Sequence, residues 1–205
     1  MATEPKKRPY RKRRRAETEE ETRRRITEAA VELHGTVGPA HTKMTELAER
    51  AGVSRMTVYN HFPTDADLFQ ACSSHWAKEN PYPDAAEWLR YPDPRLRLGN
   101  ALVELYGWYE QKQGMMGKVL RDAPLVPSLG AFMDESWGGY MGELVDTLSQ
   151  GWTGTDAVRD QELRAALRLA VDYHTWRSLT ESGMTDATTA AELAARMVSG
   201  VAATR

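Results

Sequence analysis

Apolar residues recur every three or four positions along most of this chain, the spacing that buries one side of a helix. A first helix is predicted from residue 17 to about His34, because Thr18 and Glu21 have the spacing of a capping box and the acidic side chains around them suit a helix start. Its buried stripe is formed by Ile26, Ala29, Ala30 and Leu33. Gly and Pro residues at 35–39 end this helix, and Thr42 is the predicted cap of the next one.

The segment between Leu47 and Leu68 predicts two short helices that meet at a tight turn. The first helix has one apolar stripe, formed by Met44, Leu47, Ala48 and Ala51. Gly52 suits the left-handed conformation at its C-terminus, and Ser54 caps the second helix, in which Val58 and Phe62 face the core. The outward side chains of this second helix are Arg55, Met56, Thr57, Tyr59 and Asn60. So small a buried side and so varied an exposed one are typical of a recognition helix in a helix-turn-helix unit.

Further helices are predicted downstream of this unit. Thr64 caps a helix over 64–79, and the four prolines of 80–94 predict a loop with one helical turn around Trp88. The apolar pattern then predicts helices near 98–109, 115–122, 128–149, 163–174 and 190–201. Periodicity alone leaves open whether the last two pair with a second subunit or pack within one chain.

The net charge of −2 is unevenly distributed. Residues 1–70 carry 14 Lys+Arg and 11 Asp+Glu, whereas residues 71–205 carry 13 and 18. Eight of the ten residues from Lys6 to Arg15 are basic, and residues 1–16 hold too little apolar material to fold. We therefore expect a disordered basic arm that follows DNA phosphates or enters a minor groove; the alternative is a solubilising tail.

The chain resembles the TetR family of transcriptional regulators over roughly residues 18–75. The family's turn, followed by a threonine, an aliphatic residue, a tyrosine and a His-Phe pair, is represented here by Ala48, Gly52, Val53, Ser54, Thr57, Val58, Tyr59, His61 and Phe62. The resemblance implies an all-α fold. A three-helix helix-turn-helix DNA-binding domain is expected over 17–63, and a C-terminal helical ligand-binding and dimerisation domain over 64–205, with 64–79 as the linking helix.

The resemblance also implies a homodimer through the last two helices and a palindromic double-stranded DNA operator. Arg55, Met56, Thr57 and Asn60 are the expected base contacts. The expected phosphate contacts come from the arm, the start of the second helix and the recognition helix, namely Arg11, Arg13, Arg14, Thr42, Lys43, Thr45, Thr57, Tyr59 and His61. Two positions depart from the family pattern, because Met56 replaces a small residue and Asp65 replaces a phosphate-binding lysine.

Aromatic and methionine side chains are abundant over residues 88–176 and are candidates to line a cavity for an apolar or aromatic effector. The candidates are Trp88, Tyr106, Tyr109, Met115, Met116, Trp137, Met141, Tyr173 and Trp176. The alternative is an ordinary core, since such residues at helical spacing usually pack against one another. An effector cavity is implied mainly by the family.

We expect no enzymatic activity, cofactor or metal, because the sequence holds no nucleophile elbow, phosphate loop or zinc-binding motif. Cys72 is interpreted as a core residue, and His34 and His41 as solvent-facing. No apolar run approaches membrane-spanning length and no secretory signal follows the basic start, so we expect a cytoplasmic protein. The function predicted is an effector-responsive DNA-binding regulator, most simply a repressor. The alternatives are control by a protein partner or by no ligand, and an enzyme with an accessory DNA module.

Overall fold

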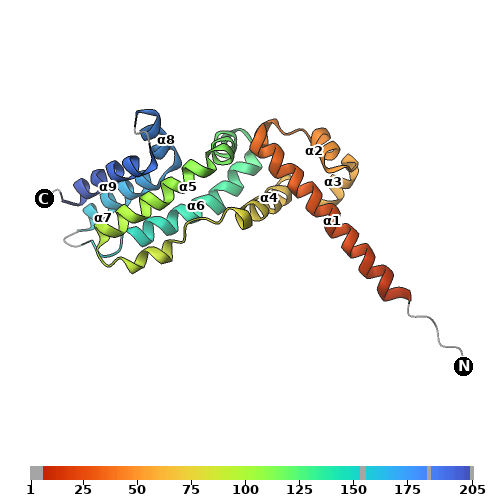
Figure 1. Ribbon diagram of the computed structural model, residues 1–205, viewed down its shortest axis with the longest axis horizontal. Coiled ribbons are helices and arrows are strands. Elements are labelled where there is room, and N and C mark those ends of the chain that lie inside the picture. Colours follow the sequence, from red (N-terminus) through yellow and green to blue (C-terminus); the bar gives the residue numbers. More distant parts are fainter. Residues whose placement is uncertain (1–6, 153–155, 184–185, 204–205) are drawn as a thin grey trace, which may run out of the picture. The chain divides into compact units, whose positions relative to one another are not determined.

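The computed structural model describes residues 7–152, 156–183 and 186–203, and every regular element in those ranges is helical (Figure 1). The chain divides into two compact units, which are described separately below. Unit 1 comprises residues 1–80 and 117–132, and unit 2 comprises residues 81–116 and 133–205. The predicted division at residue 64 differs from this arrangement, because the predicted linking helix and residues 117–132 belong to the N-terminal unit.

Unit 1 is built from α1 (Lys7–Thr36), the 3-10 turn η1 (Pro39–His41), α2 (Met44–Ala51), α3 (Arg55–His61) and α4 (Asp65–Glu79). It also contains η3 (Ala123–Leu125). Both α2 and α4 pack against α1, and α3 packs against α2. The predicted stripes meet in one core, which consists of Ile26, Ala29, Ala30, Leu33, Leu47, Ala48, Ala51, Val58, Phe62, Leu68 and Cys72. The three-helix unit and the buried position of Cys72 are thus confirmed.

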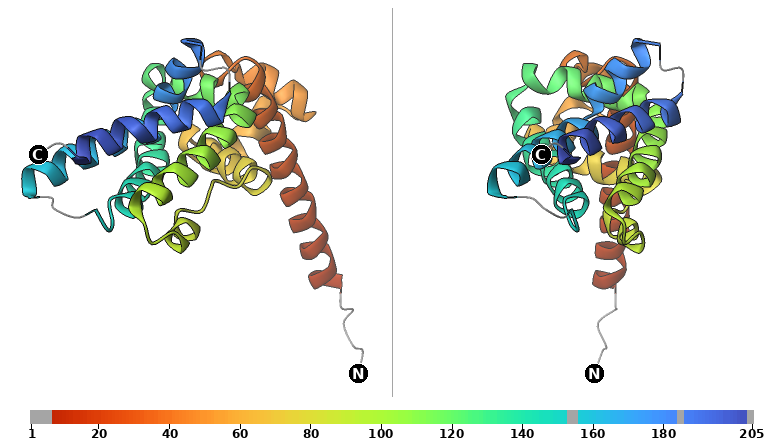
Figure 2. Two further views of the ribbon diagram at one scale, coloured as in Figure 1. Left: turned by 60° about the vertical axis from the view of Figure 1, so that its left-hand side comes forward. Right: turned by 90° about the vertical axis from the view of Figure 1, so that its left-hand side faces the viewer.

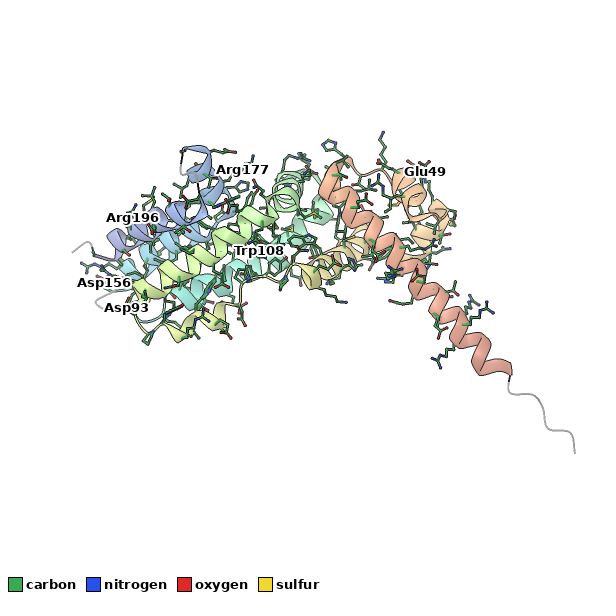
Figure 3. All side chains as sticks on the ribbon, in the orientation of Figure 1. Glu49, Asp93, Trp108, Asp156, Arg177 and Arg196 are labelled. Carbon is green, nitrogen blue, oxygen red and sulfur yellow. The ribbon has the colours of Figure 1, made fainter. Side chains whose placement is uncertain are left out.

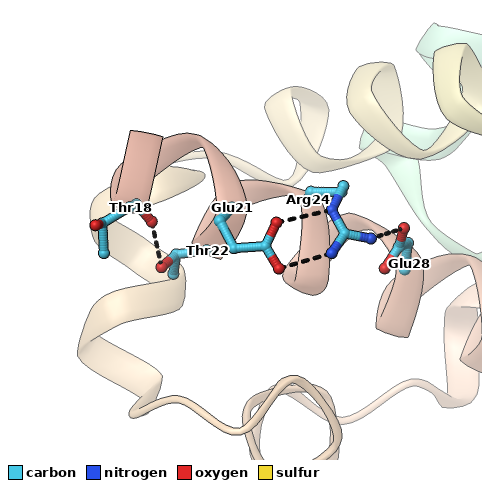
Figure 4. A network of polar contacts seen from close by, with 5 residues as sticks. All are labelled: Thr18, Glu21, Thr22, Arg24 and Glu28. Carbon is cyan, nitrogen blue, oxygen red and sulfur yellow. Dashed lines mark hydrogen bonds and ion pairs between the residues drawn. The ribbon is translucent and has the colours of Figure 1, made fainter. Parts of the chain in front are cut away.

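Helix α1 begins earlier than the sequence pattern predicted. It starts at Lys7, so residues 7–16 are helical where a disordered arm was expected, and residues 1–6 lie outside the described part. Thr18 is no cap, because its hydroxyl donates to Arg14 O one turn back. Arg and Lys are good helix formers, and acidic partners one turn away offset the repulsion between them. Figure 4 shows one such arrangement, in which the Arg24 guanidinium binds Glu21 on one side and Glu28 on the other.

The predicted turn signals of the helix-turn-helix unit are confirmed except at Thr42. Gly52 ends α2 in the left-handed conformation with φ 65° and ψ 40°, and Ser54 Oγ accepts from Thr57 N at the start of α3. Thr64 opens α4 with a complete capping box, in which Asp67 is the second partner. Thr42 does not cap α2, because Lys43 occupies the cap position while the Thr42 hydroxyl donates to Gly38 O.

Unit 2 contains the 3-10 turn η2 (Ala85–Arg90), most of α5 (Pro94–Asp122) and α6 (Pro127–Leu148), α7 (Ala157–Val171), α8 (Tyr173–Glu181) and α9 (Ala187–Ala203). The turn around Trp88 and the helix over 128–149 are confirmed. The predicted break before Met115 is wrong, since α5 runs through Gly114, a residue that costs a helix only about 1 kcal/mol. Helix α9 packs along α7, as Figures 1 and 2 show.

One predicted C-terminal helix is divided in two. The helix expected over 163–174 ends at Val171, and α8 begins at Tyr173. Asp172 lies at the break, where its carboxylate accepts from His174 N and caps α8. Two buried phenols of α5 bind the end of α7, because Tyr106 Oη donates to Ala170 O at 2.7 Å and Tyr109 Oη donates to Val171 O at 2.6 Å. These bonds satisfy carbonyls that a continuous helix would have paired.

Candidate nucleic-acid interface and effector site

Helix α3 is held in unit 1 by a small number of buried contacts. Val58 is fully buried and Phe62, which follows the helix, is 3% exposed. Arg23 of α1 fastens the other end of α3, since its Nη1 donates to His61 O at 2.7 Å and its guanidinium lies 4.2 Å from the centre of the Phe62 ring. The sequence analysis did not single out Arg23, although its place one turn before Ile26 puts it beside the buried stripe of α1. The helix is therefore fixed along its inner side while its outer side stays accessible.

The outer side of α3 presents chemically varied side chains. Arg55, Met56, Tyr59 and Asn60 are exposed, with Met56 at 68% and Tyr59 at 43%. Thr57 and His61 are half-buried, and the Thr57 hydroxyl lies 2.9 Å from the Ser54 hydroxyl. Base-pair edges in the major groove present hydrogen-bond donors, acceptors and the thymine methyl group, so this mixture of polar groups and an exposed thioether suits them.

The remaining predicted DNA contacts come from α1 and the start of α2. Lys43 and Thr45 are exposed, whereas Thr42 is half-buried with its hydroxyl already donating. Arg13 and Arg14 are exposed on α1, and Arg13 pairs with Glu17, also exposed. An exposed pair of this kind is weak, so the guanidinium remains available to a phosphate. The Arg11 side chain lies outside the described residues.

A buried carboxylate fixes the turn that precedes α2, and the sequence analysis missed it. Asp122 is fully buried and accepts from Ala40 N at 3.0 Å and from Arg121 Nε at 2.6 Å. Arg121 Nη2 in turn donates to Val37 O. Burial alone would raise the pKa of Asp122, but the hydrogen bonds from Arg121 and Ala40 outweigh it and hold the pKa below its usual value.

His34 lies beside this carboxylate in the interior, so its predicted solvent-facing position is wrong. It is 6% exposed and its ring packs 5.8 Å from the ring of Phe69. Burial lowers the pKa of His34 to about 4, although Asp122 acts in the opposite direction. The error arose because the neighbours that bury His34 come from α4 and from the distant residue 122. His41, the other histidine of this turn, is exposed as expected.

In unit 2, many of the predicted effector-binding side chains meet in one aromatic cluster. Four buried rings form a chain of contacts, in which Tyr106 contacts Tyr109, Tyr109 contacts Tyr173, and Tyr173 contacts Trp176. Their ring centroids are 5.2–6.1 Å apart. The half-buried ring of Trp137 lies 6.3 Å from that of Tyr109, and Met141 Sδ lies 4.0 Å from Tyr109 Oη. Burial raises the pKa of Tyr106 and Tyr109 well above the usual phenol value.

Three other predicted effector-site residues, Trp88, Met115 and Met116, are also buried or half-buried. Trp88 is fully buried, and its Nε1 donates to Glu104 at 2.8 Å. Met116 is 4% exposed and Met115 is half-buried.

A second group of rings joins this cluster to the proline-rich segment before η2. Tyr82 stacks on Tyr140 with centroids 5.0 Å apart and also contacts Trp108 and Trp137. Trp108, labelled in Figure 3, donates through Nε1 to Pro81 O, and Tyr140 Oη donates to Pro83 O. An open groove runs beside these residues, lined in part by Tyr82, Glu104 and Trp108. Tyr82 was missed, although its place between two prolines is itself an unusual signal.

Comparison with known proteins agrees with the geometry of unit 1. Residues 26–72 match the sequence profile of the bacterial regulatory proteins of the tetR family. Over these residues the chain resembles the TetR family. The HTH-type transcriptional regulator TtgR of Pseudomonas putida is 44% identical over 59 residues, which are 29% of this chain and 28% of TtgR. The sequence match thus spans less than a third of that relative.

Over about nine tenths of the chain, the fold resembles that of solved TetR-type structures. The NalD structure, described as the secondary repressor of the MexAB-OprM multidrug efflux pump in Pseudomonas aeruginosa, gives a TM-score of 0.58 at 20% identity, over 90% of this chain and 97% of NalD. A TetR transcription regulator from Haloarcula marismortui gives 0.54 at 19% identity, over 88% and 96%. These similarities confirm the predicted all-α fold, with an N-terminal helix-turn-helix domain and a helical C-terminal part.

Both departures from the TetR pattern lie on the surface. Met56 is the second residue of α3 and among the most exposed large apolar side chains of the described residues. Asp65 is exposed in the first turn of α4, where a carboxylate suits the helix but not a phosphate.

Two general searches of the described residues complete the description. No helix there is both long and apolar enough to cross a bilayer. Within the same residues, no three His, Cys, Asp or Glu side chains gather in a way that suits a metal ion.

Proposed function

We propose that this TetR-type protein is a homodimeric, sequence-specific DNA-binding transcriptional regulator, a repressor that a small apolar or aromatic effector releases from a palindromic operator. The observation that carries the proposal is α3, whose inner side is buried at Val58 while Arg55, Met56 and Asn60 face outward. The match of residues 26–72 to the tetR profile supports the same assignment.

The exposed face of α3 carries groups for both parts of DNA recognition. Arg55 has the paired donors that fit the O6 and N7 atoms of guanine, Asn60 fits the N6 and N7 atoms of adenine, and Met56 has an apolar tip that fits a thymine methyl. Lys43, Thr45, Tyr59 and the α1 residues Arg13 and Arg14 are the proposed phosphate contacts, together with Arg11, Thr42, Thr57 and His61. Phosphate contacts of this kind add affinity and register.

The proposed dimer uses the exposed apolar face of α7 and α9. Val158 and Leu169, eleven residues apart on α7, are 65% and 66% exposed, and Met197 on α9 is 60% exposed. Because α7 and α9 pack against each other, these side chains belong to one pair of helices. Large exposed apolar side chains on two helices that pack together favour burial against a second copy. The pair corresponds to the helices predicted at 163–174 and 190–201, while α8 lies between them in sequence.

The proposed effector site is the aromatic cluster of unit 2, formed by Tyr106, Tyr109, Trp137, Met141, Tyr173 and Trp176. Trp88, Met115 and Met116 are further candidates from the sequence pattern. An effector that binds the DNA-free conformation more tightly than the DNA-bound one would shift the dimer toward the DNA-free conformation. The size of the shift is limited by the difference between its affinities for the two conformations. Control by a protein partner, or by no ligand, is the alternative that the test below separates.

The test is a selection of bound sequences from random duplex DNA with the full chain. We expect one enriched sequence with two-fold symmetry, its half-sites about one helical turn apart. The variant Asn60→Ala should lose preference at one position in each half-site, while Arg95→Ala, an exposed arginine of unit 2, should recover the wild-type sequence. No enriched sequence, or an asymmetric one, would contradict the proposal. Once the operator is known, aromatic compounds that release it distinguish effector control from the alternatives.

A further inference from the structure

Trp176 differs from the other buried indoles of unit 2. It is 3% exposed on α8, and among the described residues no atom accepts a hydrogen bond from its Nε1. Trp88 and Trp108 are also buried, but their N–H groups donate to Glu104 at 2.8 Å and to Pro81 O at 2.9 Å. A buried donor that lost water and gained no acceptor is rare in folded proteins, so it calls for an explanation.

The neighbouring phenols do not supply the acceptor. The Trp176 ring lies 5.8 Å from that of Tyr109 and 5.2 Å from that of Tyr173, both centroid to centroid. The Tyr109 hydroxyl is directed to Val171 O at 2.6 Å, and the Tyr173 hydroxyl to Gln113 O at 3.5 Å. These hydroxyls interact with backbone carbonyls, with Met141 Sδ and with the Arg177 side chain, and neither phenol is paired with the Trp176 donor.

The surroundings of Trp176 favour an uncharged acceptor. Trp176 is 3% exposed and Tyr109 is fully buried, so a charged acceptor between them would lose its hydration, and the same burial raises the pKa of Tyr109 well above the usual value. A carboxylate or phenolate would meet the same penalty, whereas a carbonyl, an ether or an unprotonated ring nitrogen would not.

We propose that Trp176 Nε1 donates a hydrogen bond to a neutral acceptor of the effector. The effector is then a planar aromatic molecule that lies against Tyr109 and Tyr173. The proposal rests on the effector response put forward above and adds to it the chemical class of the effector. An aromatic molecule without an acceptor would gain the ring contacts but would leave the indole donor unpaired, so it would bind more weakly.

The test compares quinoline with naphthalene, two molecules of nearly the same shape that differ in one ring nitrogen. Their affinities for the full chain are measured by calorimetry at mildly alkaline pH, where the quinoline nitrogen is unprotonated. We expect Trp176→Phe to weaken quinoline by about fivefold or more while naphthalene changes by less than about twofold. Trp108→Phe makes the same chemical change where the indole is paired, and should keep the wild-type ratio of the two affinities.

An unchanged affinity ratio in Trp176→Phe, or no binding of quinoline to the wild-type chain, would overturn the proposal. A second measurement needs no substitution. In wild-type protein with 15N-labelled tryptophan, quinoline should move the Trp176 indole N–H resonance to lower field, and naphthalene should not; equal movement by both would also overturn it. If the proposed effector control of DNA binding is wrong, the result is different: quinoline binds through Trp176 but leaves operator affinity unchanged.

Discussion

The carboxylate of Asp122, the last residue of α5, accepts a hydrogen bond from the backbone N–H of Ala40 at 3.0 Å. The two residues are 82 positions apart, yet the bond fixes the turn that leads into α2. Gly38 makes the close approach possible, because its φ of 98° and its missing side chain leave room where a Cβ would come 2.4 Å from Asp122 Oδ2. A residue far from the helix-turn-helix sequence thus shapes the entry to it.

Replacing Asp122 should therefore destabilise unit 1. Asp122→Ala leaves Ala40 N–H without its buried acceptor and removes the carboxylate that accepts from Arg121 Nε, so we expect the free energy of unfolding to fall by about 1.5–3 kcal/mol. Urea unfolding measures it. Asp134→Ala removes an exposed carboxylate of α6 and should change the value by less than about 0.5 kcal/mol. Equal effects of the two substitutions would contradict the role given to Asp122.

The pH dependence of stability should carry the signature of His34. Its pKa in the folded protein is about 4, below the ordinary value of 6.5, so the unfolded chain binds a proton that the folded protein does not. The stabilisation is complete above pH 6.5 and is lost as pH falls from 6.5 to 4, by up to about 3 kcal/mol. In His34→Gln this slope should disappear between those pH values, whereas His41→Gln, an exposed control, should keep it. A slope unchanged in His34→Gln would reject the assignment.

Arg23 should link the stability of α3 to DNA binding. Arg23→Ala removes the bond to His61 O and the guanidinium over Phe62, and we expect a loss of about 1–3 kcal/mol of stability together with weaker operator binding. Arg25→Ala changes an exposed arginine two positions away and should affect stability much less. Chemical unfolding and gel-shift titration measure the two effects. Weaker operator binding without any loss of stability would indicate a direct DNA contact instead.

Association of two chains should depend on the apolar face of α7. Leu169→Glu places a charge on that face, and we expect the dimer dissociation constant to rise at least about tenfold. Leu125→Glu is a matched control, because both leucines are 66% exposed but Leu125 lies in unit 1. Sedimentation velocity over a range of concentrations measures the equilibrium. A Leu169→Glu protein that associates like wild type would place the dimer interface elsewhere.

The sequence allowed good predictions where a feature depends on neighbours a few residues away. Gly52, Ser54 and Thr64 mark helix ends by local backbone chemistry, and Val58 and Phe62 show the buried side of α3 by spacing alone. Features that depend on distant residues were not predicted. His34 is buried by Phe69 and lies near Asp122, and no local pattern shows this.

Continuity of helices was also hard to predict. Residues 7–16 were judged by their lack of apolar side chains, whereas pairs such as Arg13 with Glu17 accompany a helix there. The division at Asp172 was invisible to periodicity because the side chains on both sides keep helical spacing.

The most direct measurement of the central claim compares wild-type protein with Arg55→Ala and Asn60→Ala on every single-base variant of one operator half-site. If α3 reads base edges, each substitution abolishes discrimination at one base pair, lowers affinity for the best sequence by about 1–3 kcal/mol, and leaves discrimination elsewhere intact. Uniform weakening at all positions, or no change at any, would mean that α3 does not read the DNA sequence.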